Sequence, residues 1–205
     1  MRQWKGFLAS MVVATAGLTS SLQAKFDAGL INVSFGNKET AYEGKAVLGA
    51  DGDKWNAPEG EKGDKVELAD AKKEKTEVAV TFVGTGVWDA EDAGFIGTPL
   101  EKLLRHYLYS NDAQKVTLNG LTPKAKYDLI VYSASNQDGR KTKFTIGSDS
   151  KTTAYATEKK ELAEDVNYAK FSATADDEGN LVLTYEGVEG GEGNLNAIQI
   201  APASK

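Results

Sequence analysis

The stretch Gly190 to Ile200, "GGEGNLNAIQI", shows the pattern on which the fold of this chain depends. Its glycines favour a tight turn, and the residues after them alternate between polar and apolar side chains. A phosphate-binding loop is excluded, because such loops carry a different sequence and run into a helix. The stretch therefore predicts a turn into a final β-strand. Alternation places Ile198 and Ile200 on the buried face of that strand and Leu195 and Ala197 on the opposite face.

The same alternation recurs in short runs along the chain, and glycine or asparagine often ends a run. β-Branched and aromatic residues are enriched in these runs, which favours strands over helices. The predicted strands are 30–35, 77–83, 115–118, 127–134, 143–146, 152–156, 168–174, 181–185 and 197–200. Many short strands at close spacing predict an all-β fold, a jelly-roll β-sandwich of about eight to ten antiparallel strands.

Two regions depart from this pattern. The segment from Pro99 to Tyr109 repeats leucine and tyrosine at helical spacing, and Thr98 before the proline fits a helix N-cap. We therefore predict one short helix packed across the sandwich. The segment 37–75 is long, glycine-rich and charged, and only 66–69 in it has the strand pattern. No internal repeat or linker is evident, so residues 25–205 are expected to form a single domain.

The first 24 residues have the layout of a secretory signal peptide. Arg2 and Lys5 precede an apolar run from Gly6 to Leu18, and small residues follow up to Ala24. The apolar run is short for a membrane span. We therefore expect cleavage after Ala24 and a secreted, periplasmic or cell-surface protein with no integral membrane segment after cleavage.

The composition narrows the classes of partner. Lys and Arg number 24, Asp and Glu number 30, and the formal net charge is −6. An acidic surface repels phosphate backbones, so nucleic acid is not an expected partner. The chain has no cysteine, which excludes a disulfide scaffold and thiolate metal sites.

Several segments occur in an order that resembles a known fold family. They are 46–49 with 52–56, 104–110 ("LRHYLYS"), 120–123 with 127–132, 144–147, 167–171 and 190–200. In that order, from about residue 29 to 201, they resemble the galactose-binding-like β-sandwich domains of secreted bacterial proteins, a fold shared by many carbohydrate-binding modules. The resemblance implies a sandwich that binds glycans through loops at one end. It does not define the ligand, because the fold also hosts enzyme accessory, adhesion and structural domains.

The sequence Gly52-Asp53-Lys54-Trp55-Asn56 is the first candidate sugar-binding loop. An exposed Trp55 would stack on the C–H face of a sugar ring, while Asp53 and Asn56 bind hydroxyls. The alternative is that Trp55 closes the open end of the sandwich and its neighbours make turn hydrogen bonds. Asp51 and Asp53 leave a calcium ion as a second option, since loop oxygens suit that metal. No other cofactor is expected.

Other candidates lie further along the chain. Trp88 opens a run with three acids, which suits a sugar or calcium or, alternatively, a solvated loop with one packed Trp. Tyr109 would add a stacking ring. Asn136 and Arg140 are common partners of sugar hydroxyls, although their run, "NQDGR", is also a hairpin signal.

The turn that opens the final strand contributes the last two candidates, Glu192 and Asn194. They are expected at a loop end of the sandwich, close enough to Asp53 and Trp55 to form one site.

Catalysis is not expected. His106, the only histidine, lies on the predicted helix away from its leucine face, and no serine has the surroundings of a nucleophile. No acid stands in the apolar setting that raises the pKa of a catalytic carboxyl. We therefore predict a secreted, non-catalytic module whose partner is an extracellular glycan. One alternative is a structural or assembly protein of the cell envelope, bound to an envelope protein and without a small ligand. A glycoside-active enzyme is a further alternative.

Overall fold

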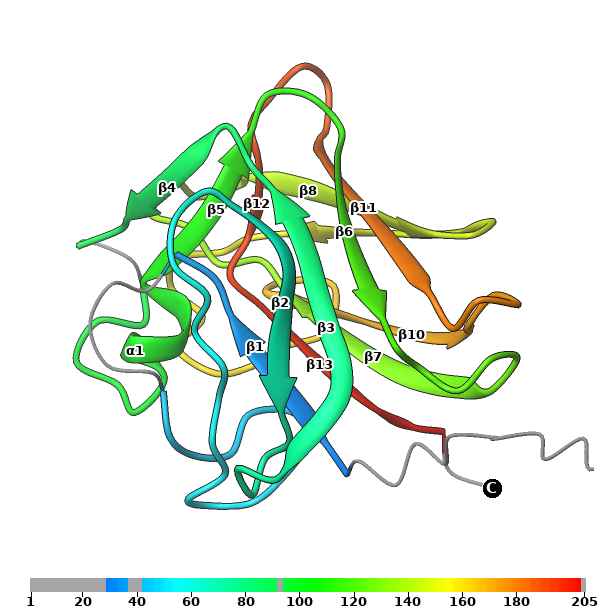
Figure 1. Cartoon of the computed structure of the whole chain (residues 1–205). Coiled ribbons are helices and arrows are strands. Elements are labelled where there is room, and N and C mark those ends of the chain that lie inside the picture. The colour runs from blue at the N-terminus through cyan, green and yellow to red at the C-terminus, as the bar shows by residue number, and fades with distance from the viewer. Residues whose placement is uncertain (1–28, 37–41, 92–93, 204–205) are drawn as a thin grey trace, which may run out of the picture.

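The computed structural model describes residues 29–36, 42–91 and 94–203, and the predicted signal peptide lies outside them. The described chain is an antiparallel β-sandwich, which confirms the predicted fold class. In the described residues, thirteen strands form three sheets, and one short helix lies outside them (Figure 1).

The sheets have the following orders. The four-stranded sheet is β1 (Ile31–Ser34), β13 (Ala197–Pro202), β7 (Lys126–Tyr132) and β10 (Tyr168–Thr174). The six-stranded sheet is β2 (Lys62–Ala69), β3 (Lys75–Val83), β6 (Gln114–Asn119), β11 (Leu181–Gly187), β8 (Lys141–Ile146) and β9 (Asp149–Ala154). A small sheet of β12 (Gly193–Leu195), β5 (His106–Ser110) and β4 (Gly86–Asp89) lies at one end (Figure 1).

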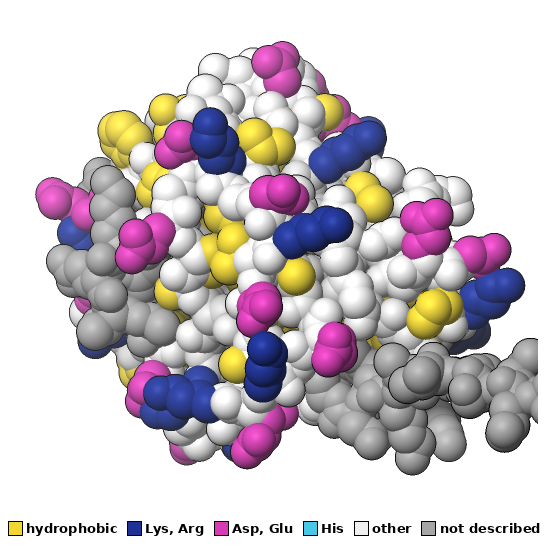
Figure 2. All heavy atoms as spheres, in the orientation of Figure 1, with side chains coloured by type: hydrophobic (Ala, Val, Ile, Leu, Met, Phe, Trp, Pro, Cys, Tyr) yellow, Lys and Arg dark blue, Asp and Glu magenta, His cyan; other side chains and the backbone are white. Residues whose placement is uncertain are grey.

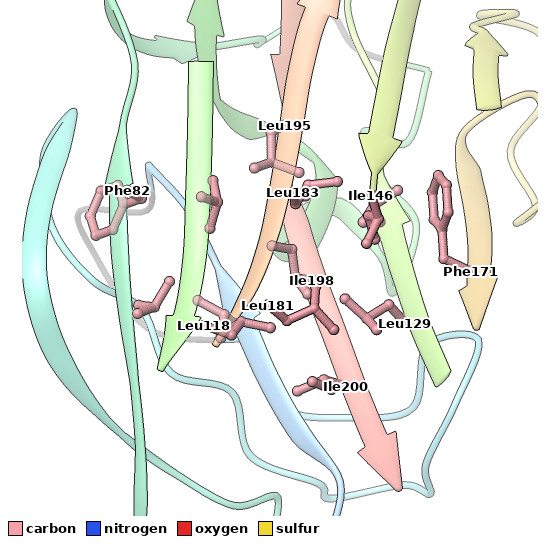
Figure 3. Packing of buried hydrophobic residues seen from close by; sticks show 14 of the residues in the cluster. Phe82, Leu118, Leu129, Ile146, Phe171, Leu181, Leu183, Leu195, Ile198 and Ile200 are labelled. Atoms are coloured by element: carbon pink, nitrogen blue, oxygen red, sulfur yellow. The ribbon is translucent and has the colours of Figure 1, made fainter. Parts of the chain in front are cut away.

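The main core lies between the two large sheets. Apolar side chains from alternate positions of their strands interdigitate there, as Figure 3 shows for Phe82, Leu118, Leu183, Leu129 and Phe171. The alternation seen in the sequence thus corresponds to this buried face.

The prediction for the last strand is correct for the isoleucines and wrong for Leu195. Ile198 and Ile200 enter the main core, and Leu195 joins them there (Figure 3). The reason is a break at Asn196, where the chain leaves the small sheet and enters the four-stranded one. The Asn196 side chain accepts a hydrogen bond from Ala134 N and donates to the carbonyl oxygens of the chain at 104 and 106, so the alternation restarts on its far side.

The helix prediction for 99–109 is wrong over its second half. The helix α1 covers only Glu101–Leu104, and β5 begins at His106. Leu103 and Leu104 are buried as helical spacing requires. The following residues, "HYLYS", instead follow the period of a strand, because β5 pairs with β4 on one side and with β12 on the other.

The outer face of the four-stranded sheet is covered by the irregular segment 42–58 and by residues around α1. A second apolar cluster forms there, with Trp55, Tyr132, Phe95 and Tyr155 among its members. Gln199 and Tyr132 anchor the cover, since the Gln199 Oε1 accepts Leu48 N at 2.9 Å and the Tyr132 hydroxyl accepts Val47 N at 3.0 Å.

The exterior carries both signs of charge. On the face in Figure 2, lysine, arginine, aspartate and glutamate side chains are interspersed. Among the described residues, no helix has the length and apolarity needed to cross a membrane.

Candidate functional site

The structure places Trp55 inside the cover of the four-stranded sheet. Its ring is 5 % exposed and meets Tyr42 and Tyr132 edge-on, with ring centroids 5.6 and 6.3 Å away. The indole N–H donates to Gly44 O at 3.1 Å. Both the apolar faces and the polar atom of Trp55 are therefore used within the protein.

Asp53 and Asn56, on either side of Trp55, are also occupied by internal contacts. Asp53 is buried, accepts Ala50 N at 2.8 Å and pairs with the Lys72 ammonium, which holds the pKa of this carboxyl below its ordinary value. The Asn56 amide donates to the carbonyl oxygens of Asn32 and Ala69 and accepts Ala69 N, at 2.8 to 2.9 Å. These are the turn and cover hydrogen bonds of the alternative interpretation of this loop.

The two calcium candidates occupy different surroundings. Asp51 is exposed and lines a groove of about 590 Å³ between the segments 42–52, 99–100 and 160–162. Both carboxylate oxygens of Asp53 already have protein partners. Within the described ranges, no group of three or more acids or histidines is placed to hold a metal ion.

Asn194 lies beneath the surface. It is fully buried in β12, where it accepts the hydroxyls of Ser133 and Thr142 at 3.0 Å and donates to Ala134 O at 2.7 Å. Its side chain therefore joins the small sheet to the end of β7 and to β8.

Three aromatic residues lie on the face of the small sheet that points away from the main core, and of these Tyr107 is buried while Trp88 and Tyr109 reach the surface. Trp88 of β4 is 49 % exposed and is the cross-strand partner of Tyr107 in β5. Tyr109 shares this face because it lies two residues along the same strand. Its cross-strand partner is Gly86, where an added Cβ would lie 2.7 Å from the Tyr109 hydroxyl oxygen. The Tyr109 ring therefore lies against the bare backbone of β4.

A polar cluster adjoins these rings. The Arg140 guanidinium lies 5.9 Å from the centroid of the Tyr107 ring, donates to the Tyr107 hydroxyl at 3.4 Å and forms an ion pair with Glu192. The Tyr107 hydroxyl in turn donates to Asn136 Oδ1 at 3.4 Å. Burial raises the pKa of the Tyr107 phenol, so it stays protonated and remains a donor.

The two side chains of this ion pair differ in their exposure to solvent. The Arg140 side chain is 9 % exposed and that of Glu192 is 27 % exposed. Both also line a groove of about 330 Å³ between the segments 137–141 and 188–192. The carboxylate is thus the more accessible partner, while the guanidinium holds it in position.

The structure therefore places the candidate residues from the sequence in three different locations. Trp88, Tyr109, Asn136, Arg140 and Glu192 belong to the aromatic face and its polar cluster. Asp53, Trp55 and Asn56 belong to the cover of the four-stranded sheet, and Asn194 is buried. In the described part of the chain, neither Glu192 nor Asn194 hydrogen-bonds to Asp53 or Trp55.

Two members of the site were not among the sequence candidates. Tyr107 links the aromatic face to Arg140, and Gly86, which has no side chain, leaves room for the Tyr109 ring. The signal that could have found Tyr107 is the tyrosine alternation in "HYLYS", which fits one face of a strand as well as it fits a helix.

None of the known protein-family models matches the chain, and no curated protein sequence matches it significantly. Solved structures share its fold. The extracellular domain of ANXUR2 from Arabidopsis thaliana matches with a TM-score of 0.50 and 9 % identity over 85 % of this chain and 41 % of that one. The ANX2 ectodomain, also from Arabidopsis thaliana, matches with a TM-score of 0.50 and 8 % identity over 86 % and 51 %.

A third solved structure with some likeness is a carbohydrate-binding module, CBM35 from Cellvibrio japonicus Abf62. It matches with a TM-score of 0.39 and 14 % identity over 60 % of this chain and 85 % of that one. The chain spans about half or less of the length of the two ectodomain structures. Identities this low show a shared β-sandwich fold with extracellular domains, and the fold alone does not define a ligand.

Proposed function

We propose that this protein is a secreted, non-catalytic glycan-binding module that holds its ligand on the outer face of the small sheet. The observation that carries the proposal is the half-exposed Trp88 beside Tyr109, next to the Arg140–Glu192 pair. A half-exposed tryptophan ring on an edge strand offers a flat apolar surface to a ligand.

The chemistry of the face suits a sugar. Aromatic rings offer flat apolar surfaces to the C–H groups of a pyranose, and the hydroxyls of the sugar need directional donors and acceptors at the edge. Asn136 and Glu192 supply such groups on the surface that adjoins the rings. Arg140 is engaged by Glu192 and Tyr107, so the site offers no unpaired guanidinium to an acidic sugar. We therefore expect neutral or amino sugars, with affinities in the millimolar to micromolar range.

A glycan array followed by titration calorimetry on the best hit tests this proposal. We expect Trp88→Ala to weaken binding at least about tenfold, an effect of about 1.4 kcal/mol, because the stacking surface is lost. Val182→Ala is the matched control, since Val182 is another exposed hydrophobic residue and lies on β11 outside the site. An array without a hit, or a Trp88→Ala protein that binds as well as the wild type, would overturn the proposal.

A structural or assembly role is the second candidate, and the position of β4 favours it. This strand is the edge of its sheet, and its far side has no partner strand in the described chain. An edge strand with an exposed aromatic side chain can add a strand from another protein. Size-exclusion chromatography and pull-downs from envelope extracts distinguish the two roles, because capture that Trp88→Ala abolishes in the absence of any glycan would support assembly.

A further inference from the structure

The aromatic face and the groove between 137–141 and 188–192 meet at the same two residues. Arg140 packs over the Tyr107 ring, and Tyr107 is the cross-strand partner of Trp88. Arg140 and Glu192 also line the groove. Cross-strand partners lie about 5 Å apart, so Trp88 and the Arg140–Glu192 pair at the groove both neighbour the buried Tyr107 ring.

The groove has the size and lining of a polar subsite. Its volume of about 330 Å³ lies near the lower end of the range for small-ligand pockets, about 300 to 1,000 Å³. Gln137, Lys141 and Glu189 line it with exposed side chains that can donate to or accept from hydroxyls. Its walls hold no aromatic ring, so binding there would depend on hydrogen bonds and shape.

We propose that the ligand is a glycan chain of at least two sugar units rather than a single sugar. One unit stacks on Trp88 and Tyr109, and the next enters the groove across the Arg140–Glu192 pair. This inference rests on the proposed function and adds the direction and minimum length of the bound chain. The Arg140–Glu192 pair has a positioning role here. Trp88 and Tyr109 bind one sugar unit, the groove residues bind the next, and the ion pair lies between the two units.

The test compares ligand length in the wild type and in a groove variant. The probes are glucose, mannose, xylose and N-acetylglucosamine, each as the monosaccharide, disaccharide and trisaccharide. For the sugar that binds, we expect the wild-type affinity to rise about tenfold from the monosaccharide to the longer forms. The double variant Lys141→Ala/Glu189→Ala should lose this rise and keep the monosaccharide affinity. Trp88→Ala should lose affinity for all lengths.

A matched control is the double variant Lys160→Ala/Glu161→Ala. It removes an exposed lysine and an exposed glutamate that line the groove of about 590 Å³ beside Asp51. It should keep the wild-type dependence on length. Equal affinity for the monosaccharide and the trisaccharide, or an unchanged length dependence in the Lys141/Glu189 variant, overturns the two-unit site while leaving glycan binding standing. Failure of the wild type to bind any probe or array glycan overturns the proposed function, and the two-unit site with it.

Discussion

The two described tryptophans lie in similar sequences and in opposite environments. Trp55 is preceded by an acid two residues earlier and followed by an amide, and Trp88 is followed by an acid. Trp55 is 5 % exposed, with its N–H and its neighbours fully hydrogen-bonded, whereas Trp88 is 49 % exposed on an edge strand. The acids near both tryptophans have internal partners, since Asp53 pairs with Lys72 and Asp89 pairs with Arg105. The exposure of the ring itself therefore distinguishes a candidate binding residue from a core residue.

The largest expected effect lies at Trp55. Replacement by alanine should lower the free energy of unfolding by about 3–5 kcal/mol, because a cavity opens between Tyr42 and Tyr132 and the Gly44 carbonyl loses its donor. Urea unfolding followed by circular dichroism measures the loss. The variant Trp55→Phe keeps a ring and should lose less. A Trp55→Ala protein as stable as the wild type would remove the contrast between the two tryptophans.

The next effect is at Asp53. Asp53→Asn should cost about 1–3 kcal/mol at neutral pH, because the buried carboxylate accepts Ala50 N and pairs with Lys72. The pKa of Asp53 is held below its ordinary value of 3.8, first by the Lys72 hydrogen bond. A depressed folded-state pKa contributes stability above the unfolded value and loses it as the pH falls through the folded one.

The measurement is therefore the difference in unfolding free energy between the wild type and Asp53→Asn across pH. It should be constant near neutrality and shrink as the pH falls below about 3.8. A difference that stays constant to lower pH would show that the charge of Asp53 does not stabilise the cover.

Arg140 should show a smaller effect on stability. Arg140→Ala removes the partner of Glu192 and the group packed over Tyr107, and we expect a loss of about 1–2 kcal/mol, because Glu192 can turn toward water. Arg140→Lys retains the charge without the planar guanidinium and should recover only part of the loss. Thermal unfolding of the two variants gives the comparison, and full recovery by lysine would show that charge alone holds the cluster.

The smallest effect on stability should be at Trp88. Trp88→Ala should change the unfolding free energy by no more than about 0.5 kcal/mol, since the ring is half in water. Acrylamide should quench a red-shifted part of the tryptophan emission in the wild type and not in this variant, whose remaining described tryptophan is buried. Emission that is equally protected in both proteins would place Trp88 in a contact, such as one between two copies of the chain.

The sequence predicted the parts of the fold that depend on alternation. Strands such as β3, β7 and β10 were predictable because each buries one face in a continuous core. The small sheet was not, because β4 and β12 are too short for a clear period and "HYLYS" fits two periods. Whether β5 forms depends on its pairing with strands far away in sequence, which no local pattern contains.

The candidate site was predictable in residue type and not in grouping. Trp88, Arg140 and Glu192 were recognisable because aromatic, guanidinium and carboxylate groups suit sugars. Their meeting requires the pairing of β4 with β5 and the approach of the 137–141 and 188–192 segments, which are distant along the chain. Asp53 and Asn56 could be set aside only once the backbone groups that bind them were located.

The pairing of β1 with β13 has a practical consequence for presentation of the site. Ile31 lies opposite Ile200, whereas Ser34, at the other end of β1, lies toward Asn196 and the small sheet. The start of β1 and the end of β13 thus lie on the side of the sandwich away from β4 (Figure 1). Attachment to a bead or sensor surface through the start of β1 or through the end of β13 should leave the aromatic face pointing outward. The two modes of attachment should therefore give the same binding curve.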